Sequence, residues 1–204
     1  MDPLGGLPLR HQLAAPAPER SDAARNRARL IVAARRIIDN RGVACLTMDL
    51  LAAESGVGKG TIFRRFGSRA GLFQTLLDDV EREFQGRFLS GPPPLGPGAP
   101  PRERLIAFGR ARVETLSTQA ELLRGAERPA EERFEVPARR VVELHILTLL
   151  RQAGVEGDLQ MLAFNLVSVL DAILTLPRGR AGGEEAARLA DGWEDLVRRL
   201  LPAD

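Results

Sequence analysis

Apolar residues recur every three or four positions along most of the 204-residue chain, with arginines and other polar residues between them. This period is typical of amphipathic helices, and no segment alternates apolar and polar residues for long enough to predict a strand. The sequence therefore predicts an all-α protein. Thr47 and Ser68 are predicted to cap two of the helices. Cap residues, glycines and prolines place the helices at about 21–41, 48–55, 58–66, 68–88, 102–118, 119–126, 137–153, 158–176 and 184–201.

Two segments rich in proline and glycine interrupt this helical pattern. Residues 1–20 hold four prolines and two glycines without a period, which predicts a flexible tail. Residues 90–101 (SGPPPLGPGAPP) cannot continue a helix and are predicted to form a flexible loop. The remaining helices divide into an N-terminal unit over 21–84 and a C-terminal unit over 85–204.

Residues 47–66 contain the most specific local signal, a short helix, a glycine turn and a second short helix. This order predicts a helix-turn-helix, with Gly56 as the left-handed residue that ends the first helix. An apolar clasp between the two helices is expected from Leu51, Val57, Ile62 and Phe66. The outer face of the second helix is then expected to carry Lys59, Gly60, Thr61, Phe63, Arg64 and Arg65.

Charge is distributed unevenly between the two parts of the chain. Residues 1–75 hold 12 Lys and Arg against 6 Asp and Glu, whereas residues 76–204 hold 17 against 21. A net charge of +6 beside the predicted helix-turn-helix indicates a polyanion as the partner of the N-terminal part. The other part, with a net charge of −4, is expected to contact a partner other than the polyanion.

A dense series of residues in one register also links the N-terminal part to a known family. Through it, residues 27–77 resemble the tetracycline-repressor (TetR-type) family of transcriptional regulators. The resemblance implies a three-helix DNA-binding domain over 21–84, followed by a helical ligand-binding and dimerisation domain over 85–204. The series consists of Arg27, Leu30-Ile31, Ala33-Ala34, Ile37-Ile38, Gly42, Thr47, Leu51-Ala52, Gly56-Val57, Gly60-Thr61-Ile62-Phe63, Phe66, Ser68-Arg69 and Leu72.

The resemblance also implies which residues touch DNA. Family members contact DNA at the positions of Thr47, Lys59, Thr61, Phe63, Arg64 and Arg69, and we add Gly60, Arg65 and Arg27 from their places beside them. Phe63 stands where the family usually has tyrosine, so no hydroxyl is present there to bind a phosphate. The arginines around Arg27, namely Arg20, Arg25 and Arg29, either reach DNA or form a solvated face.

Other functional classes find less support in the sequence. The string Gly56-Val57-Gly58-Lys59-Gly60-Thr61 looks like a phosphate-binding loop, but a helix rather than a strand is predicted before it. Cys45 is the single cysteine, which excludes an internal disulfide and a multi-cysteine metal site, and we expect it to be buried and inert rather than a redox sensor. No catalytic constellation, cofactor or metal site is predicted, and the chain is not expected to be an enzyme.

The C-terminal helices suggest a dimer and a pocket. Residues 159–176 are apolar nearly all round, which predicts a second partner beside the helix's own core, although the helix could also be buried within the monomer. The resemblance implies that the last two helices build the dimer interface, so residues 158–201 are expected to form a homodimer interface with Leu170 inside it. The helices at 102–118 and 137–153 are then expected to surround an effector pocket. Its candidate lining is Phe108, Arg112, His145, Leu149 and Phe164, although His145 is first of all a candidate for a hydrogen-bonded core residue.

These features together predict a homodimeric repressor that a small, partly apolar effector releases from a palindromic double-stranded DNA operator. The alternative is a TetR-like regulator that responds to no small molecule. No apolar run is long enough for a membrane span and no secretory signal is evident, so the expected location is the cytoplasm.

Overall fold

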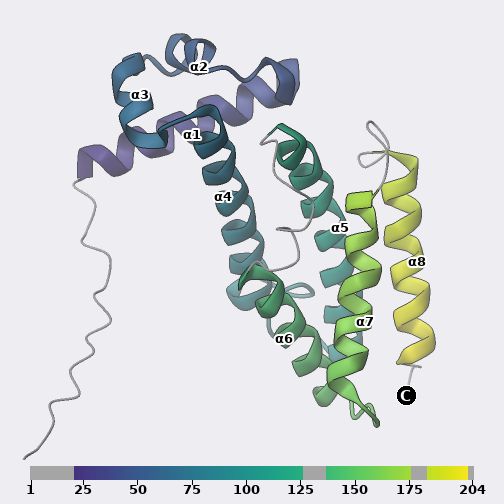
Figure 1. Ribbon diagram of the computed structural model, residues 1–204. Helices are drawn as coiled ribbons and strands as arrows, with labels where there is room; N and C mark the ends of the chain where they lie inside the picture. Colours follow the sequence, from purple (N-terminus) through teal and green to yellow (C-terminus); the bar gives the residue numbers. More distant parts are fainter. Residues whose placement is uncertain (1–20, 126–136, 176–182, 202–204) are drawn as a thin grey trace, which may run out of the picture.

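The described residues of the chain fold into helices. The computed structural model describes residues 21–125, 137–175 and 183–201, and contains no strand in these ranges. The predicted all-α class is therefore confirmed, while the tail 1–20 lies outside the described residues. Figure 1 shows the elements in order: α1 (Ser21–Arg41), η1 (Val43–Cys45), α2 (Met48–Ser55), α3 (Lys59–Phe66), α4 (Arg69–Ser90), α5 (Pro101–Gly125), α6 (Pro137–Gln152), α7 (Leu159–Asp171), η3 (Ala172–Thr175) and α8 (Glu184–Leu200).

Side-chain caps fix the starts of several helices. The Thr47 hydroxyl accepts a hydrogen bond from the Leu50 backbone N–H at 3.1 Å, and the Ser68 hydroxyl accepts one from Gly71 at 3.1 Å. Asp158 caps α7 in the same way through the Met161 N–H. Each cap satisfies a backbone donor that the first turn of a helix leaves unpaired. The caps predicted at Thr47 and Ser68 are confirmed.

Three local features differ from the prediction. The two helices expected at 102–118 and 119–126 are one continuous helix, α5, because no glycine or proline separates them and Thr118 bonds back to the Glu114 carbonyl within the helix. The short turn η1 between α1 and α2 was not predicted. The helix expected over 158–176 ends at Asp171 and tightens into η3.

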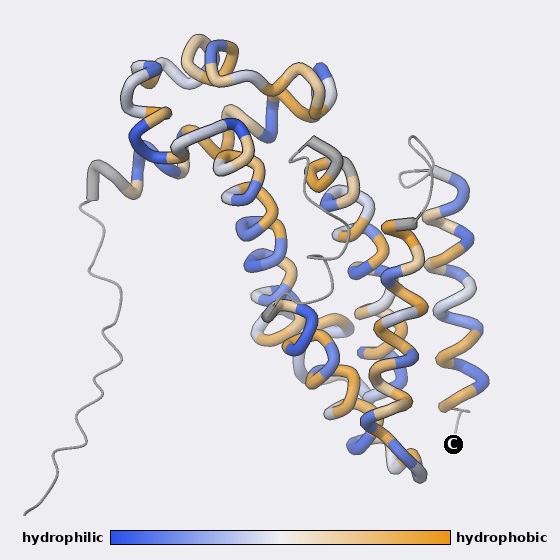
Figure 2. The backbone as a smooth tube through the Cα atoms, viewed as in Figure 1, coloured by the Kyte–Doolittle hydropathy of each residue, from blue (hydrophilic) through white to orange (hydrophobic). Residues whose placement is uncertain are grey.

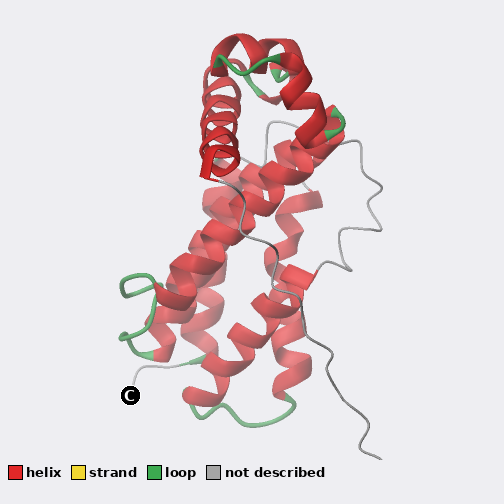
Figure 3. Ribbon diagram, turned by 90° about the vertical axis from the view of Figure 1, so that its left-hand side faces the viewer, coloured by secondary structure: helices red, strands yellow, loops and turns green. Residues whose placement is uncertain are grey.

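The helices form two groups that share α4. Figures 1 and 3 show α1, α2 and α3 gathered at one end, with α4 running from them into a bundle of α5, α6, α7 and α8. In that bundle α8 packs chiefly against α5, and α6 packs against α7. Apolar residues line the inner sides of these helices, as the colours in Figure 2 show.

Each group of helices has its own hydrophobic cluster. The first cluster joins α1, α2, α3 and the start of α4, and Leu122 of α5 also belongs to it. The second joins the end of α4 to α5, α6, α7 and α8. Along α4 the change from one cluster to the other falls between Val80 and Phe84. The domain boundary after residue 84 stays a prediction, but α4 is plainly the element on which both clusters are built.

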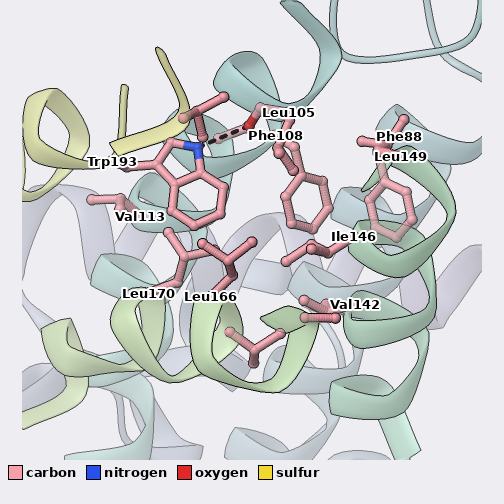
Figure 4. Packing of buried hydrophobic residues seen from close by; sticks show 14 of the residues in the cluster. Phe88, Leu105, Phe108, Val113, Val142, Ile146, Leu149, Leu166, Leu170 and Trp193 are labelled. Atoms are coloured by element: carbon pink, nitrogen blue, oxygen red, sulfur yellow. Dashed lines mark hydrogen bonds between the residues drawn. The ribbon is translucent and has the colours of Figure 1, made fainter. Parts of the chain in front are cut away.

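Trp193 holds α8 against α5 in the second cluster. Its side chain is fully buried and its Nε1–H donates a hydrogen bond to the Leu105 carbonyl at 2.8 Å (Figure 4). The indole lies so close to Gly109 that a Cβ at this position would overlap it. A large aromatic residue facing a glycine thus allows two helices to approach closely.

The connection over residues 90–101 is anchored at several points. Gly91 donates to the Arg87 carbonyl at 3.0 Å, Gly96 donates to the Pro92 carbonyl at 2.9 Å, and Leu95 packs against the second cluster. The flexibility of this loop stays a prediction, but Leu95 ties its middle to the bundle.

Candidate nucleic-acid interface

The α2–turn–α3 unit has a firm apolar interior. Leu51, Val57, Ile62 and Phe66 are all buried, which confirms the predicted clasp between the two helices. Gly56 adopts the left-handed conformation at φ 66° and ends α2, as its position in the sequence predicts. The Ser55 hydroxyl accepts the Val57 N–H at 3.2 Å and so fixes the turn. The unit is therefore rigid on its inner side.

The outward side of α3 carries most of the residues predicted to touch DNA. Lys59, Gly60, Phe63 and Arg64 are exposed, while Thr61 and Arg65 are half-buried. Phe63 shows 42% of its surface, a large exposure for an apolar side chain. Arg64 makes no hydrogen bond or ion pair with another residue in the described ranges. Phe63 and Arg64 therefore have little role inside the fold and are available to an outside partner.

Lys59 has a neighbour that sequence reasoning missed. Its ammonium forms an ion pair with Asp49 of α2, and both side chains remain largely exposed. The ammonium also lies 5.9 Å from the centroid of the Phe63 ring. Nothing in the ten-residue spacing of Asp49 and Lys59 indicates this pair, because the turn between α2 and α3 brings them together. Asp49 holds the Lys59 side chain along the outer side of the unit.

Two further predicted contacts, Thr47 and Arg69, also have structural roles. Thr47 is exposed at the start of α2, where its oxygen accepts the capping bond and its hydroxyl proton remains able to bind an anion. The Arg69 Nε–H donates to the Leu46 carbonyl at 3.0 Å, and its guanidinium lies 4.6 Å from the Phe73 ring centroid. Arg69 thereby ties the loop before α2 to α4. That Arg69 binds a phosphate stays a prediction.

The arginines of α1 mostly bind other helices. Arg29 donates to the Ser55 carbonyl at 3.1 Å, and Arg36 binds the Glu54 carboxylate at 2.7 Å, so both hold the end of α2. Arg35 bridges to α4 through Asp79 at 2.7 Å. Arg27 is half-buried and lines a groove between α1 and α4. Arg20 lies outside the described residues. The structure therefore gives Arg29 an internal role, while a DNA contact by Arg27 stays a prediction.

One expectation about the sequence around this unit is wrong. Cys45 is exposed rather than buried, because the unpredicted turn η1 carries it to the surface. The phosphate-binding loop, which the sequence already disfavoured, does not form, since the lysine begins α3 and the helix α2 rather than a strand comes directly before it.

Among the five candidate pocket residues, the structure brings three together. Phe108, His145 and Leu149 belong to the interior of the bundle, and the His145 ring lies 4.9 Å from that of Phe108 and 4.4 Å from that of Phe88. Burial, with the positive charge of Arg104, lowers the pKa of His145 to about 4. Its Nε2 is buried and has no hydrogen-bond partner among the described residues, so the expected core hydrogen bond at this atom is absent there.

The other two candidate pocket residues lie elsewhere. Arg112 is buried between α5 and α4, where it pairs with Glu81 at 2.8 Å. Burial alone would raise the pKa of Glu81, but the charge and hydrogen bond of Arg112, with a further bond from Gln119, lower it. Phe164 is 45% exposed on α7, 5.0 Å below the guanidinium of Arg139. Phe164 therefore lines no interior pocket in this arrangement.

The outward side of α7 forms an exposed apolar stripe, which we define as Met161, Phe164 and Val169. Leu170 is buried within the same chain, so its expected place inside a dimer interface is wrong. The apolar residues of α8, among them Trp193 and Val197, are also buried against the bundle. An interface between two copies would thus use the stripe of α7 together with the polar outer side of α8.

Neither a metal site nor a membrane span is present among the described residues. No group of three or more His, Cys, Asp or Glu side chains in this part of the chain is placed to hold a metal ion. No helix within the described ranges is long and apolar enough to cross a membrane.

Comparisons with known proteins agree with this arrangement. Residues 30–76 match the family described as "Bacterial regulatory proteins, tetR family". An HTH-type transcriptional regulator of Staphylococcus aureus (strain USA300) is 38% identical over 53 residues, which make up 26% of this chain and 29% of that regulator. The chain thus spans less than a third of the length of the curated relatives it matches.

Likeness over most of the chain comes from solved structures. A TetR-family transcriptional regulator from Pectobacterium atrosepticum superposes with a TM-score of 0.66 at 25% identity, over 91% of this chain and 98% of the other. A TetR/AcrR-family regulator from Thermobifida fusca shares the fold at 18% identity, with a TM-score of 0.62 over 85% of this chain and 96% of the other. In its N-terminal segment the chain thus matches the tetR family of bacterial regulatory proteins, and over most of its length it shares the fold of solved regulators of that family.

Proposed function

We propose that this protein is a DNA-binding transcriptional regulator, a homodimeric repressor that acts at a palindromic operator in the cytoplasm and has no enzymatic activity. The observation that carries the proposal is the outer side of α3, where Lys59, Gly60, Phe63 and Arg64 are exposed on a unit whose inner side is firmly packed. A rigid helix with exposed basic side chains is what the major groove of DNA accepts.

Each group on this surface has a distinct part in DNA binding. Arg64 and Lys59 neutralise phosphates or read base edges, and guanine is the base that Arg and Lys bind most often. Gly60 leaves room for the DNA near the start of α3, where the backbone N–H groups and helix dipole favour phosphate. Phe63 offers an apolar contact, such as one to a thymine methyl group. Thr47 donates its hydroxyl proton to a phosphate beside α2.

A second copy of the chain supplies the second α3 helix that a palindromic operator requires. Met161, Phe164 and Val169 are the large apolar residues of α7 that folding leaves exposed, beside Gln160, Asn165 and Ser168, and a two-fold interface would bury this side against its own copy. Such a dimer presents two α3 helices to successive major grooves about 34–36 Å apart. The operator is then a palindrome.

An effector would act from within the bundle. The buried group of Phe88, Phe108 and His145 offers aromatic surface and one unpaired nitrogen, which suits a small, partly apolar molecule with a single polar group. One observation favours the alternative, a regulator without an inducer: the three rings already contact one another, so a ligand must open room between them.

Electrophoretic mobility shift on duplex DNA that flanks the protein's own gene tests the proposal. We expect a discrete complex of two protomers per duplex, and at least tenfold weaker binding to a shuffled duplex of the same length and composition, as specific and non-specific affinities usually differ by far more. Equal affinity for both duplexes would contradict the proposal that the protein recognises a specific operator sequence. The absence of any complex at low salt would contradict the proposal that it binds DNA.

A further inference from the structure

A cavity of about 280 Å³ lies where α1, α4 and α5 meet. This junction is separate from the outer side of α3 but borders the buried aromatic group around His145, because the Phe84 ring lies 5.0 Å from that of Phe88 and 5.3 Å from that of Phe108. Its floor is apolar and consists of Ile38, Leu76, Val80, Phe84 and Leu122. The floor residues come from both hydrophobic clusters, since Phe84 belongs to the second cluster and the others to the first. The cavity therefore lies on the border between the DNA-binding helices and the bundle.

The rim of this cavity carries more negative than positive charge. Its acids are Asp39, Glu83 and Glu114, and its bases are Arg35 and Arg87. Arg35 is shared between Glu83 at 2.9 Å and Asp79 at 2.7 Å, so its charge is already compensated. Asp79 also pairs with Arg82 at 3.2 Å, so the three carboxylates of the rim itself face its two bases, which leaves the rim with an excess of one negative charge.

Two carboxylates on the rim remain largely available. Asp39 is exposed and has no hydrogen bond or ion pair with any described residue. Glu114 is also exposed, and it forms an ion pair with Arg87 at 3.8 Å, a distance too long for a hydrogen bond. The two acids lie on different helices, Asp39 on α1 and Glu114 on α5, on the rim of the same cavity.

We propose that this junction cavity binds a small organic cation, an amine or amidine carried on a compact apolar body. The apolar floor accepts the body, while Asp39 and Glu114 bind the cationic group at the rim. A metal ion does not fit, because no group of three metal-ligating side chains exists in the described parts of the chain. The volume suits a molecule with one ring.

A ligand in this place would also act on α4 and α1 directly. It touches α1 and α4 of the DNA-binding part on one side and α5 of the bundle on the other. Leu122 and Leu123 of α5 pack into the first cluster here, so this is where the bundle touches the DNA-binding helices. A cation that prefers one spacing of α1 and α5 changes operator affinity by its differential affinity for that spacing. Only this consequence rests on the proposed function; binding at the cavity does not.

The test is a saturation-transfer NMR titration of the full-length protein with phenethylamine, and with 2-phenylethanol as the neutral analogue of the same shape. We expect the amine to bind several-fold more tightly than the alcohol. The double variant Asp39→Asn/Glu114→Gln should remove this preference, because an exposed ion pair contributes a factor of about two to five. Glu103→Gln is the matched control, an exposed acid of α5 outside this cavity, and should keep the preference.

The variant Thr118→Phe tests the place rather than the charge. Thr118 lines the cavity and is exposed, so a phenyl group there should fill the entrance and weaken the binding of both probes without unfolding the protein. Equal affinity for amine and alcohol, an unchanged preference in the double variant, or no binding of the amine at about 10 mM would overturn the site. Operator affinity measured with and without the amine is a separate reading: a bound amine that leaves it unchanged supports the site and overturns the coupling.

Discussion

Gly60, the second residue of α3, is where replacement by alanine should change folding stability and DNA affinity in opposite directions. A Cβ built at Gly60 meets no atom within 4 Å, so nothing inside the protein requires a glycine there. Alanine is favoured over glycine in a helix by about 0.5–1 kcal/mol, with the lower end expected so close to the first turn. Gly60→Ala should therefore raise the melting temperature by about 1–4 °C.

The same methyl group should weaken binding to DNA. If the backbone at Gly60 lies against the DNA, a Cβ displaces at least one hydrogen bond to a charged phosphate, worth about 1.5–3 kcal/mol. This free energy corresponds to at least tenfold weaker binding for each protomer. The melting temperature is measured by circular dichroism, and operator affinity by fluorescence anisotropy on a labelled duplex.

Gly86→Ala is the matched control for this experiment. Gly86 is also exposed and helical, a Cβ there also meets no atom within 4 Å, and it lies in the half of α4 that runs into the bundle. It should stabilise the fold by a similar amount and leave DNA affinity unchanged. The reasoning is refuted if Gly60→Ala binds the operator as tightly as the wild type, or if it lowers the melting temperature.

Three other substitutions test separate parts of the structure. Val169→Arg places a charge in the exposed stripe and should yield a folded monomer in light scattering, and a persistent dimer would show that the stripe is not the interface. The pKa of His145 is about 4 in the fold against 6.5 in the unfolded chain. Its contribution to the free energy of unfolding is therefore complete above pH 6.5 and is lost as the pH falls towards 4. The loss is up to about 1.4 kcal/mol for each pH unit. Urea unfolding of His145→Leu should show a flatter pH dependence in this window, and an unchanged dependence would contradict the burial argument. Glu81→Gln leaves the buried Arg112 guanidinium without its counter-charge. The free energy of unfolding in urea should fall by about 3 kcal/mol. A decrease of less than about 1 kcal/mol would mean that the pair is not desolvated.

The sequence predicts the DNA-binding unit well because its signals act over a few residues. The caps at Thr47 and Ser68 act on N–H groups three residues ahead, and Gly56 acts on its own backbone. The apolar clasp follows from helical spacing on either side of one turn. Such local rules do not depend on how distant parts of the chain pack, so the structure reproduces them.

The interactions that position this unit span much longer distances in the chain. Arg29 and Ser55 are 26 residues apart, Glu81 and Arg112 are 31 apart, and neither spacing predicts a contact. Phe164 shows the same limit, because a helix that is apolar nearly all round does not reveal which side faces the core. We predicted that it faces inward, and packing of α7 on α6 places it outward.

The salt dependence of operator binding tests the central claim, that α3 binds DNA through its exposed basic residues, most directly. Anisotropy titrations of the wild type, Arg64→Ala and Arg151→Ala over a range of salt concentrations give the slope of log K against log salt. Arg151 is an exposed arginine at the far end of α6 and serves as the control. We predict that Arg64→Ala flattens the slope by about 0.9 for each phosphate that the arginine no longer neutralises, or about two for the dimer, while Arg151→Ala leaves it unchanged. An Arg64→Ala protein with wild-type affinity and slope would contradict the claim.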